Sequence, residues 1–190
     1  GLTGVGRFIP HHFDTAVLLH GCPDSDVTPP DNSFTYSGHP FSVTVTAKNA
    51  ASGTTTNYYA APGFAKAVTI SNAGSVTNFS NHTIAATNFA SGLRNQTNVL
   101  YTYPVASKET VPATLTLRAA EDMPGGDSVT SDTVGTEASA PIRSGRLHLF
   151  NAYGSELAAL SLPMWVEYFS TDGWVKNTVD TCTALNGTIL

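Results

Sequence analysis

The stretch that decides the fold is Phe41–Ala47, which has the sequence FSVTVTA. Apolar side chains alternate with hydroxyl-bearing side chains throughout this stretch. An extended chain points successive side chains to opposite faces, so this alternation is typical of an extended segment with one face toward a core and one toward water. The stretch therefore predicts a half-buried β-strand.

The same two-residue period recurs in the second half of the chain. Apolar and polar residues alternate in Thr114–Arg118 and again in Arg146–Leu149. The stretch Leu160–Phe169 carries apolar residues on both faces, which predicts a central or covered strand. Pro163 cannot donate to a strand ladder, so we expect it at a bulge, at an edge or at the beginning of that strand.

Shorter apolar runs add further strand candidates, and none of them sustains the 3.6-residue period of a helix. These runs are Phe13–Leu19, Phe34–Tyr36, Phe64–Ile70, Val76–Phe79, Asn98–Tyr103 and Gly173–Val175. Polar, turn-forming segments separate them. The pattern predicts an all-β fold, an immunoglobulin-like or jelly-roll-like β-sandwich of about ten short strands.

The length of 190 residues suits one domain or two small ones, and we expect a single β-sandwich domain over residues 1–190. The segment 123–141 contains the turn Gly125-Gly126-Asp127. We expect this segment to be a long mobile loop or a sub-boundary between two groups of strands.

Charge is scarce in this sequence. Charged residues make up 12% of the chain, and 9 Lys and Arg against 14 Asp and Glu leave a net charge of −5. Few and scattered basic residues cannot neutralise a phosphate backbone, so we expect no nucleic-acid partner. The apolar runs are far shorter than the ~20 residues of a membrane helix, so we expect no membrane insertion.

Cys22 and Cys182 are the only cysteines and lie near opposite ends of the chain. The Thr-rich, charge-poor composition suggests a secreted or surface protein, which favours a disulfide between them. Closing so long a loop would stabilise the fold by up to ~5 kcal/mol on the chain-entropy model. Two buried free thiols are the alternative, and His20 with Cys22 would begin a metal site that lacks a second ligand pair.

Several strings of the sequence are long, ordered and unusual. In the first half they are Gly6–Asp14 (GRFIPHHFD), Phe34–Phe41 (FTYSGHPF), Val45–Ala50 (VTAKNA) and Thr54–Tyr58 (TTTNY). In the second half they are Arg143–Leu147 (RSGRL), Asn151–Leu157 (NAYGSEL), the alternating strand to Tyr168, Trp174–Thr178 (WVKNT) and Cys182-Thr183. In this order they resemble the C-terminal domain of MshQ-like proteins, and the resemblance runs from about Gly4 to Thr183.

The resemblance implies a surface protein of a Gram-negative bacterium. MshQ-like proteins are associated with the mannose-sensitive haemagglutinin type IV pilus, and this domain of theirs has no assigned catalytic residues. We therefore expect an extracellular module that is not an enzyme. Its expected partners are other copies of itself or other pilus and surface subunits.

Aromatic residues are the first candidate binding set. They could stack on sugars or contact another subunit, although strands also bury aromatic side chains in the core. The candidates are Tyr58, Tyr59, Tyr101, Tyr103 and Trp165.

Acidic residues around the Gly-Gly turn are the second candidate set, and they could gather oxygen ligands for a calcium ion. They are Glu121, Asp122, Asp127 and Asp132. A solvated acidic loop is the plainer interpretation. We expect no cofactor other than this calcium.

Three function classes follow from these observations. The first is a non-enzymatic assembly module of a pilus-associated or filament-forming protein, in which a terminal segment such as Gly1–Ile9 adds a strand to the next subunit. The second is a carbohydrate-binding adhesin module, assisted by calcium. The third is a hydrolase, which would depend on His11, His12 and Asp14 alone.

Overall fold

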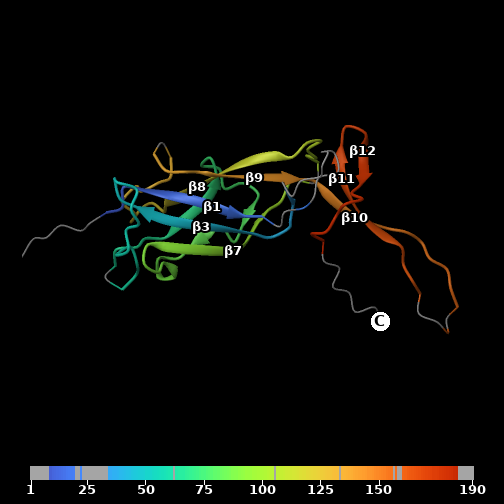
Figure 1. Ribbon diagram of the computed structural model, residues 1–190, viewed down its shortest axis with the longest axis horizontal. Helices are drawn as coiled ribbons and strands as arrows, with labels where there is room; N and C mark the ends of the chain where they lie inside the picture. Colours follow the sequence, from blue (N-terminus) through green and yellow to red (C-terminus); the bar gives the residue numbers. More distant parts are fainter. Residues whose placement is uncertain are drawn as a thin grey trace, which may run out of the picture. The chain divides into compact units, whose positions relative to one another are not determined.

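The computed structural model describes residues 9–19, 22, 34–61, 63–104, 106–132, 134–155, 157 and 160–183. Within these residues the chain is nearly all β (Figure 1). The strands are β1 (His12–Leu18), β2 (Thr35–Tyr36), β3 (Phe41–Lys48), β4 (Val68–Asn72), β5 (Phe79–Ser80), β6 (Thr83–Ile84), β7 (Leu93–Tyr101), β8 (Ala113–Glu121), β9 (Ala138–Arg143), β10 (Gly145–Leu149), β11 (Met164–Ser170) and β12 (Gly173–Lys176). One short 3₁₀ helix spans Ala86–Asn88. The predicted all-β sandwich class is confirmed.

The described residues form two compact units built from interleaved segments. Unit 1 takes its residues from Gly1–Leu18, Pro40–Thr102 and Thr114–Ala140. Unit 2 takes its residues from Leu19–His39, Tyr103–Ala113 and Pro141–Leu190. The expectation that residues 1–190 form a single domain stays a prediction. In the described part of the chain, no helix is long and apolar enough to cross a membrane.

Unit 1 contains two sheets joined across their inner faces. One sheet has the order β1-β3-β7-β5. In the other sheet β8 lies beside β4, and β4 lies beside β6. The burial of β3 alternates perfectly from Phe41 to Lys48, as the two-residue period predicts. Thr15 of β1 donates its hydroxyl to the carbonyl oxygen of Leu117 in β8 at 2.8 Å, which links the two sheets.

An aromatic cluster fills one end of the core of unit 1. The ring of Tyr58 lies 5.7 Å from that of Phe13 and 5.0 Å from that of Phe89, both edge-to-face. The Tyr58 hydroxyl donates to the carboxylate of Glu121 at 2.7 Å. This bond satisfies two buried polar groups at once, because Tyr58 and Glu121 are both buried.

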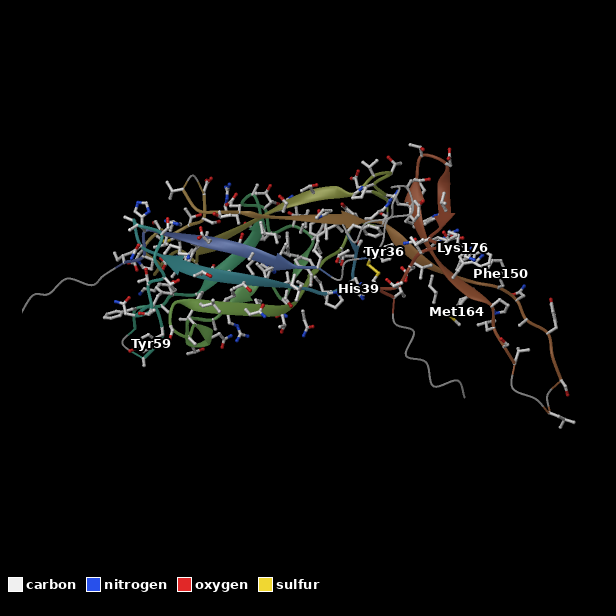
Figure 2. All side chains as sticks on the ribbon, in the orientation of Figure 1. Tyr36, His39, Tyr59, Phe150, Met164 and Lys176 are labelled. Carbon is white, nitrogen blue, oxygen red and sulfur yellow. A yellow bond between two sulfur atoms is a disulfide. The ribbon has the colours of Figure 1, made fainter. Side chains whose placement is uncertain are left out.

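Unit 2 is built around a three-stranded antiparallel sheet in the order β10-β11-β12. Its small core holds Cys22, Phe34, Tyr36 and Tyr168, with Val166, Val175 and Cys182 packed against it. A disulfide joins Cys22 and Cys182, as the cysteine content predicts. Figure 2 shows this bond in yellow beside Tyr36 and His39.

The structure differs from the sequence predictions in the presence of some short strands and in the residues at which other strands begin. Strand β9 (Ala138–Arg143) begins inside the segment 123–141, so the last part of that segment is a strand and not a loop; the segment shows no clear alternation. Strand β6 is only two residues long, too short to show a period. Strand β11 spans Met164–Ser170, so residues 160–162, the first part of the predicted strand Leu160–Phe169, lie outside it, and Pro163 directly precedes it.

Two glycines of unit 1 give a matched test of the packing. Both have a positive φ, 80° at Gly92 and 74° at Gly63. A Cβ at Gly92 would overlap the carbonyl oxygen of Thr55, whereas nothing lies within 4 Å of a Cβ at Gly63. We expect Gly63→Ala to lower the free energy of unfolding by about 1 kcal/mol and Gly92→Ala by about 3 kcal/mol, measured in urea. Equal losses would contradict the described packing at Gly92.

Candidate functional site

The sheet β10-β11-β12 of unit 2 has two chemically different faces. Strand pairing places Arg146 opposite Glu167, His148 opposite Trp165, and Phe169 opposite Trp174. Side chains on directly paired residues share a face of the sheet. We call this the cationic face and define it by Arg146, His148, Trp165, Glu167, Phe169, Trp174 and Lys176.

Glu167 is the centre of the cationic face. Its buried carboxylate accepts hydrogen bonds from Arg146 Nε at 2.6 Å and from the Trp165 indole N–H at 2.9 Å. The His148 ring nitrogen Nδ1 lies 2.8 Å from the same carboxylate. Burial raises the pKa of this carboxyl group, but the bonds from Trp165, His148 and Arg146 outweigh it and lower the pKa to about 2. Glu167 is therefore ionised at neutral pH.

Cations lie over aromatic rings along the cationic face. The Arg146 guanidinium is 4.4 Å from the centroid of the Trp174 ring, and Lys176 Nζ is 4.6 Å from that of Trp165. Lys108 Nζ lies 5.9 Å from the Phe169 ring. Such contacts contribute about 0.5–1 kcal/mol at exposed sites. They hold positive charge at defined places on the face.

The hairpin beyond these residues continues the aromatic stacking. The Phe150 ring is stacked on His148 at 4.3 Å and lies 4.1 Å from the Trp165 ring. Figure 2 labels Phe150 and Lys176 in this part of unit 2. The rings therefore form a continuous, partly exposed aromatic surface.

Most of the positive charge of unit 2 lies at the cationic face. Unit 2 contains four of the nine Lys and Arg residues of the chain: Lys108, Arg143, Arg146 and Lys176. Arg143 is buried, with its guanidinium 3.8 Å from the Tyr168 ring. The other three lie on or against the cationic face, whereas the chain as a whole is acidic.

The opposite face of the sheet is apolar, and part of it is exposed. Near Tyr168 it packs on the disulfide core. Farther along the hairpin, large apolar side chains are between 36% and 53% exposed. We call these residues the apolar patch: Leu147, Leu149 and Met164 on the strands, and Leu160 and Leu162 just before β11.

The sequence-predicted aromatic residues belong to both units and have different surroundings. Tyr58 is a core residue, and Tyr59 is exposed in the loop that follows it. Tyr101 packs edge-to-face on Phe79 in unit 1, and in unit 2 the Tyr103 hydroxyl donates to the Ile142 carbonyl oxygen at 3.1 Å. Trp165 is the one member of the set on the cationic face.

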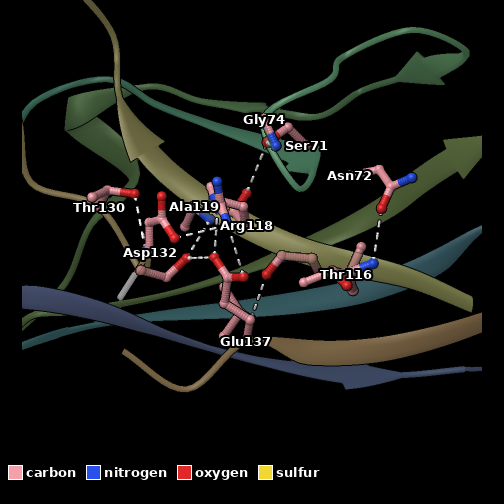
Figure 3. A network of polar contacts seen from close by, with 12 residues as sticks. Ser71, Asn72, Gly74, Thr116, Arg118, Ala119, Thr130, Asp132 and Glu137 are labelled. Atoms are coloured by element: carbon pink, nitrogen blue, oxygen red, sulfur yellow. Dashed lines mark hydrogen bonds and ion pairs between the residues drawn. The ribbon is translucent and has the colours of Figure 1, made fainter. Parts of the chain in front are cut away.

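The carboxylates of three of the four predicted acidic residues bond different neighbours. Glu121 accepts bonds from Tyr58 and from the Asp127 backbone N–H, and Asp122 accepts the Thr69 hydroxyl at 2.6 Å. Asp132 pairs with Arg118 at 2.9 Å (Figure 3). The calcium prediction therefore gains no support from a shared arrangement of these carboxylates.

Arg118 ties the Asp132 loop to a larger network in unit 1. Its guanidinium bonds both carboxylate oxygens of Glu137, at 2.8 and 3.3 Å. The bonds from Arg118 outweigh burial and, with the Ser131 hydroxyl, lower the pKa of Glu137. The network is a structural feature that fixes the segment before β9.

The histidine and cysteine candidates also contact neighbouring residues of the fold. His12 is buried, and its Nε2 lies 3.6 Å from Asp14, which also accepts the Thr136 backbone N–H. The His39 ring lies near the sulfur atoms of Cys22 and Cys182, which are bonded to each other and so present no thiolate to a metal. The candidate ligand His20 lies outside the described residues.

Sequence reasoning included Trp165 among the candidate residues but missed Glu167, Trp174 and the three cations. A signal was present, since the two-residue period through Met164–Ser170 already places Trp165, Glu167 and Phe169 on one face. The position of β12 beside β11 could not be found that way, because pairing depends on the turn between the strands.

Family models match the whole chain in two parts. The model of the third domain of DUF6701 matches residues 1–147, and that of the fourth domain of DUF6701 matches residues 143–190. The two matches meet where β9 ends and β10 begins. Neither a curated protein nor a solved structure matches the chain.

The low pKa of Glu167 predicts acid destabilisation of unit 2. A lowered carboxyl pKa stabilises the fold above the unfolded-state value of 4.5, and this stabilisation is lost as the pH falls toward about 2. We expect Glu167→Gln to lower the free energy of unfolding by about 2 kcal/mol at pH 7 and to flatten its decline below pH 4.5.

Tryptophan fluorescence follows this transition, because both tryptophans of the chain lie in unit 2. Glu109→Gln, at an exposed carboxylate of the same unit, is the matched control and should change stability little. An equally steep acid transition in the Glu167→Gln protein would contradict the assigned role of Glu167.

Proposed function

The chain belongs to the DUF6701 family, and on this premise we propose that it is a non-enzymatic, extracellular assembly module of a bacterial surface protein. The module acts through protein–protein contacts in a pilus-associated or filament-forming protein. The resemblance to MshQ-like proteins supports the pilus association and a Gram-negative source. The disulfide and the low charge support an extracellular location.

The apolar patch is the observation that carries this proposal. It gathers five large apolar side chains on one hairpin of unit 2, each at least 36% exposed. Contiguous exposed apolar surface is typical of an interaction site, whereas single exposed apolar residues are ordinary. Because about half of each side chain is already buried, covering the rest would contribute about 1 kcal/mol per side chain to association.

The edge of the sheet supplies a second element of the interface. Strand β10 pairs only with β11 in the described sheet, so the other side of its backbone is available to pair with an added strand. Strand addition would bring apolar side chains of the partner against Leu147 and Leu149. The proposed donor is the segment Gly1–Ile9 of a second copy, which, except for Ile9, lies outside the described residues.

A carbohydrate-binding adhesin module is the alternative, and the cationic face favours it. Trp165 and Trp174 are both partly exposed there, and sugar rings stack on such surfaces. The calcium-assisted form of this alternative is less favoured, because Glu121, Asp122 and Asp132 each bond a different neighbour.

Charge placed in the apolar patch tests the assembly proposal. We expect the full chain to self-associate in sedimentation velocity and the double variant Leu147→Lys/Leu149→Lys to remain monomeric. Two lost leucine contacts should weaken association at least tenfold. Val76→Lys, at an exposed apolar residue of unit 1, is the matched control and should associate normally. Unchanged association of the double variant would contradict the proposal.

Deletion of residues 1–9 tests the donor strand. We expect the truncated chain to fold with its disulfide intact but to lose self-association, because the acceptor edge then has no partner strand. Addition of a peptide of residues 1–9 should bind the truncated chain and not the double lysine variant. Unchanged self-association of the truncated chain would contradict the donor-strand proposal.

A further inference from the structure

Two neighbouring histidines of unit 1 bring their Nδ1 atoms together at the beginning of β1. The Nδ1 atoms of His11 and His12 lie 3.0 Å apart, and the two rings meet edge-to-face. Consecutive side chains of a strand point to opposite faces, so a regular strand would keep these two rings apart. The contact forms where β1 begins at His12, because His11 precedes the strand at a bend in the chain.

Contacts with the surrounding fold hold both histidines in place. The His11 backbone N–H donates to the Lys48 carbonyl oxygen at 2.7 Å, which fixes the chain before β1 to the end of β3. The buried His12 side chain has its Nε2 atom 3.6 Å from Asp14 Oδ1. The Thr136 backbone N–H donates to the same oxygen at 2.7 Å and fixes the carboxylate. His11 is exposed, so a rigidly held pair of ring nitrogens is accessible to solvent.

The Asp14 carboxylate determines which nitrogen of neutral His12 carries the proton. Negative charge beside Nε2 favours the proton on that nitrogen, which leaves the Nδ1 lone pair directed at His11. Carboxylates commonly orient metal-ligating histidines from the second ring nitrogen in this way. The other Asp14 oxygen, Oδ2, lies 3.8 Å from Lys48 Nζ, which offsets part of the negative charge.

The spacing of the two Nδ1 atoms suits a metal ion with bonds at right angles. With metal–nitrogen bonds of about 2.0–2.1 Å, nitrogens 3.0 Å apart subtend an angle of about 90–100° at the metal. This angle matches neighbouring ligands of a tetragonal ion better than the wider angle of a tetrahedral one. Copper(II) prefers tetragonal geometry and binds nitrogen ligands more tightly than the other divalent ions of its row.

We propose that the Nδ1 atoms of His11 and His12 bind a copper(II) ion as two neighbouring ligands. The ion replaces the proton that lies between the two nitrogens. His11 loses this proton from Nδ1 to solvent and takes one up from solvent on Nε2, so both rings stay neutral and no net proton is released.

Asp14 is a positioning residue of this site and does not ligate the ion. Within the described part of the chain, no group of three or more clustered ligand atoms includes the histidine pair, so water completes the coordination. The proposal goes beyond the assembly function and does not depend on it.

Copper(II) titration of the full chain, followed by electron paramagnetic resonance in a buffer that does not ligate metals, tests the proposal. We expect one bound ion with two imidazole nitrogens in its signal. His11→Gln should bind copper(II) at least tenfold more weakly and lose one nitrogen from the signal, because one ligand is gone. This exposed position lets the variant fold. His82→Gln, at another histidine of unit 1, is the matched control and should change the affinity less than twofold.

Asp14→Asn separates positioning from ligation. An amide side chain lacks the charge that favours the proton on His12 Nε2, so we expect about tenfold weaker copper(II) binding with both nitrogens kept in the signal. Loss of a nitrogen from this signal, or unchanged affinity, would contradict the positioning role of Asp14.

Two outcomes would overturn the copper(II) site itself. Equal affinity of the His11→Gln protein and the unmodified chain would mean an adventitious ion only, bound by other groups such as the terminal amine. A signal from the unmodified chain with fewer than two imidazole nitrogens would mean that the two histidines do not ligate together.

Discussion

The disulfide between Cys22 and Cys182 is the constraint on which unit 2 depends. The two cysteines are 160 residues apart, and unit 2 collects segments from three separate parts of the chain. Its core is small, with Phe34, Tyr36 and Tyr168 around the sulfur atoms. A core of this size buries too little apolar surface to order so many distant segments easily, and a covalent link reduces the entropy of the unfolded chain instead.

The polar contacts in this core also indicate that apolar packing alone does not hold unit 2 together. Asn177 donates to the Tyr36 hydroxyl at 2.8 Å, and the Tyr36 pKa is raised mainly by burial. Arg143 lies over the Tyr168 ring, so a cation replaces part of the apolar packing. Unit 2 is therefore held by a few specific contacts around one covalent bond, and its sheet can leave both faces partly exposed.

The two proposed functions use the two faces of this sheet. The faces differ because successive side chains of a β-strand point to opposite sides. The period of two puts Leu147 and Leu149 on one side and Arg146 and His148 on the other. In unit 1 the same period serves the core, because β3 buries every second side chain against the other sheet. The exposed apolar patch and the cationic face therefore reflect incomplete covering of a sheet rather than an unusual sequence pattern.

The sequence predicts the local features of this structure better than the tertiary ones. Alternation along Phe41–Ala47 predicts β3, and the composition predicts the disulfide, whereas the beginning of β11 at Met164 was not predicted. The bond from Tyr58 to Glu121 joins residues 63 positions apart. Nothing local in either stretch indicates it, since partners of buried polar groups are set by how the sheets pack.

The cationic face illustrates the same limit at the candidate site. Trp165 and Glu167 are neighbours along one strand, so their shared side of the sheet follows from the sequence. Trp174 and Lys108 reach this surface from other segments, and only the fold shows that they lie beside it. A sub-boundary was expected in the segment 123–141, but the sequence did not indicate that each unit collects three separate segments of the chain.

Amide hydrogen exchange with and without a dithiol reductant tests the central claim, that the disulfide holds unit 2 in its folded form. The account predicts that complete reduction removes the protection of β11 and β12, while β3 and β8 of unit 1 keep theirs. Unchanged protection of β11 and β12, in protein shown by mass to be fully reduced, would contradict it.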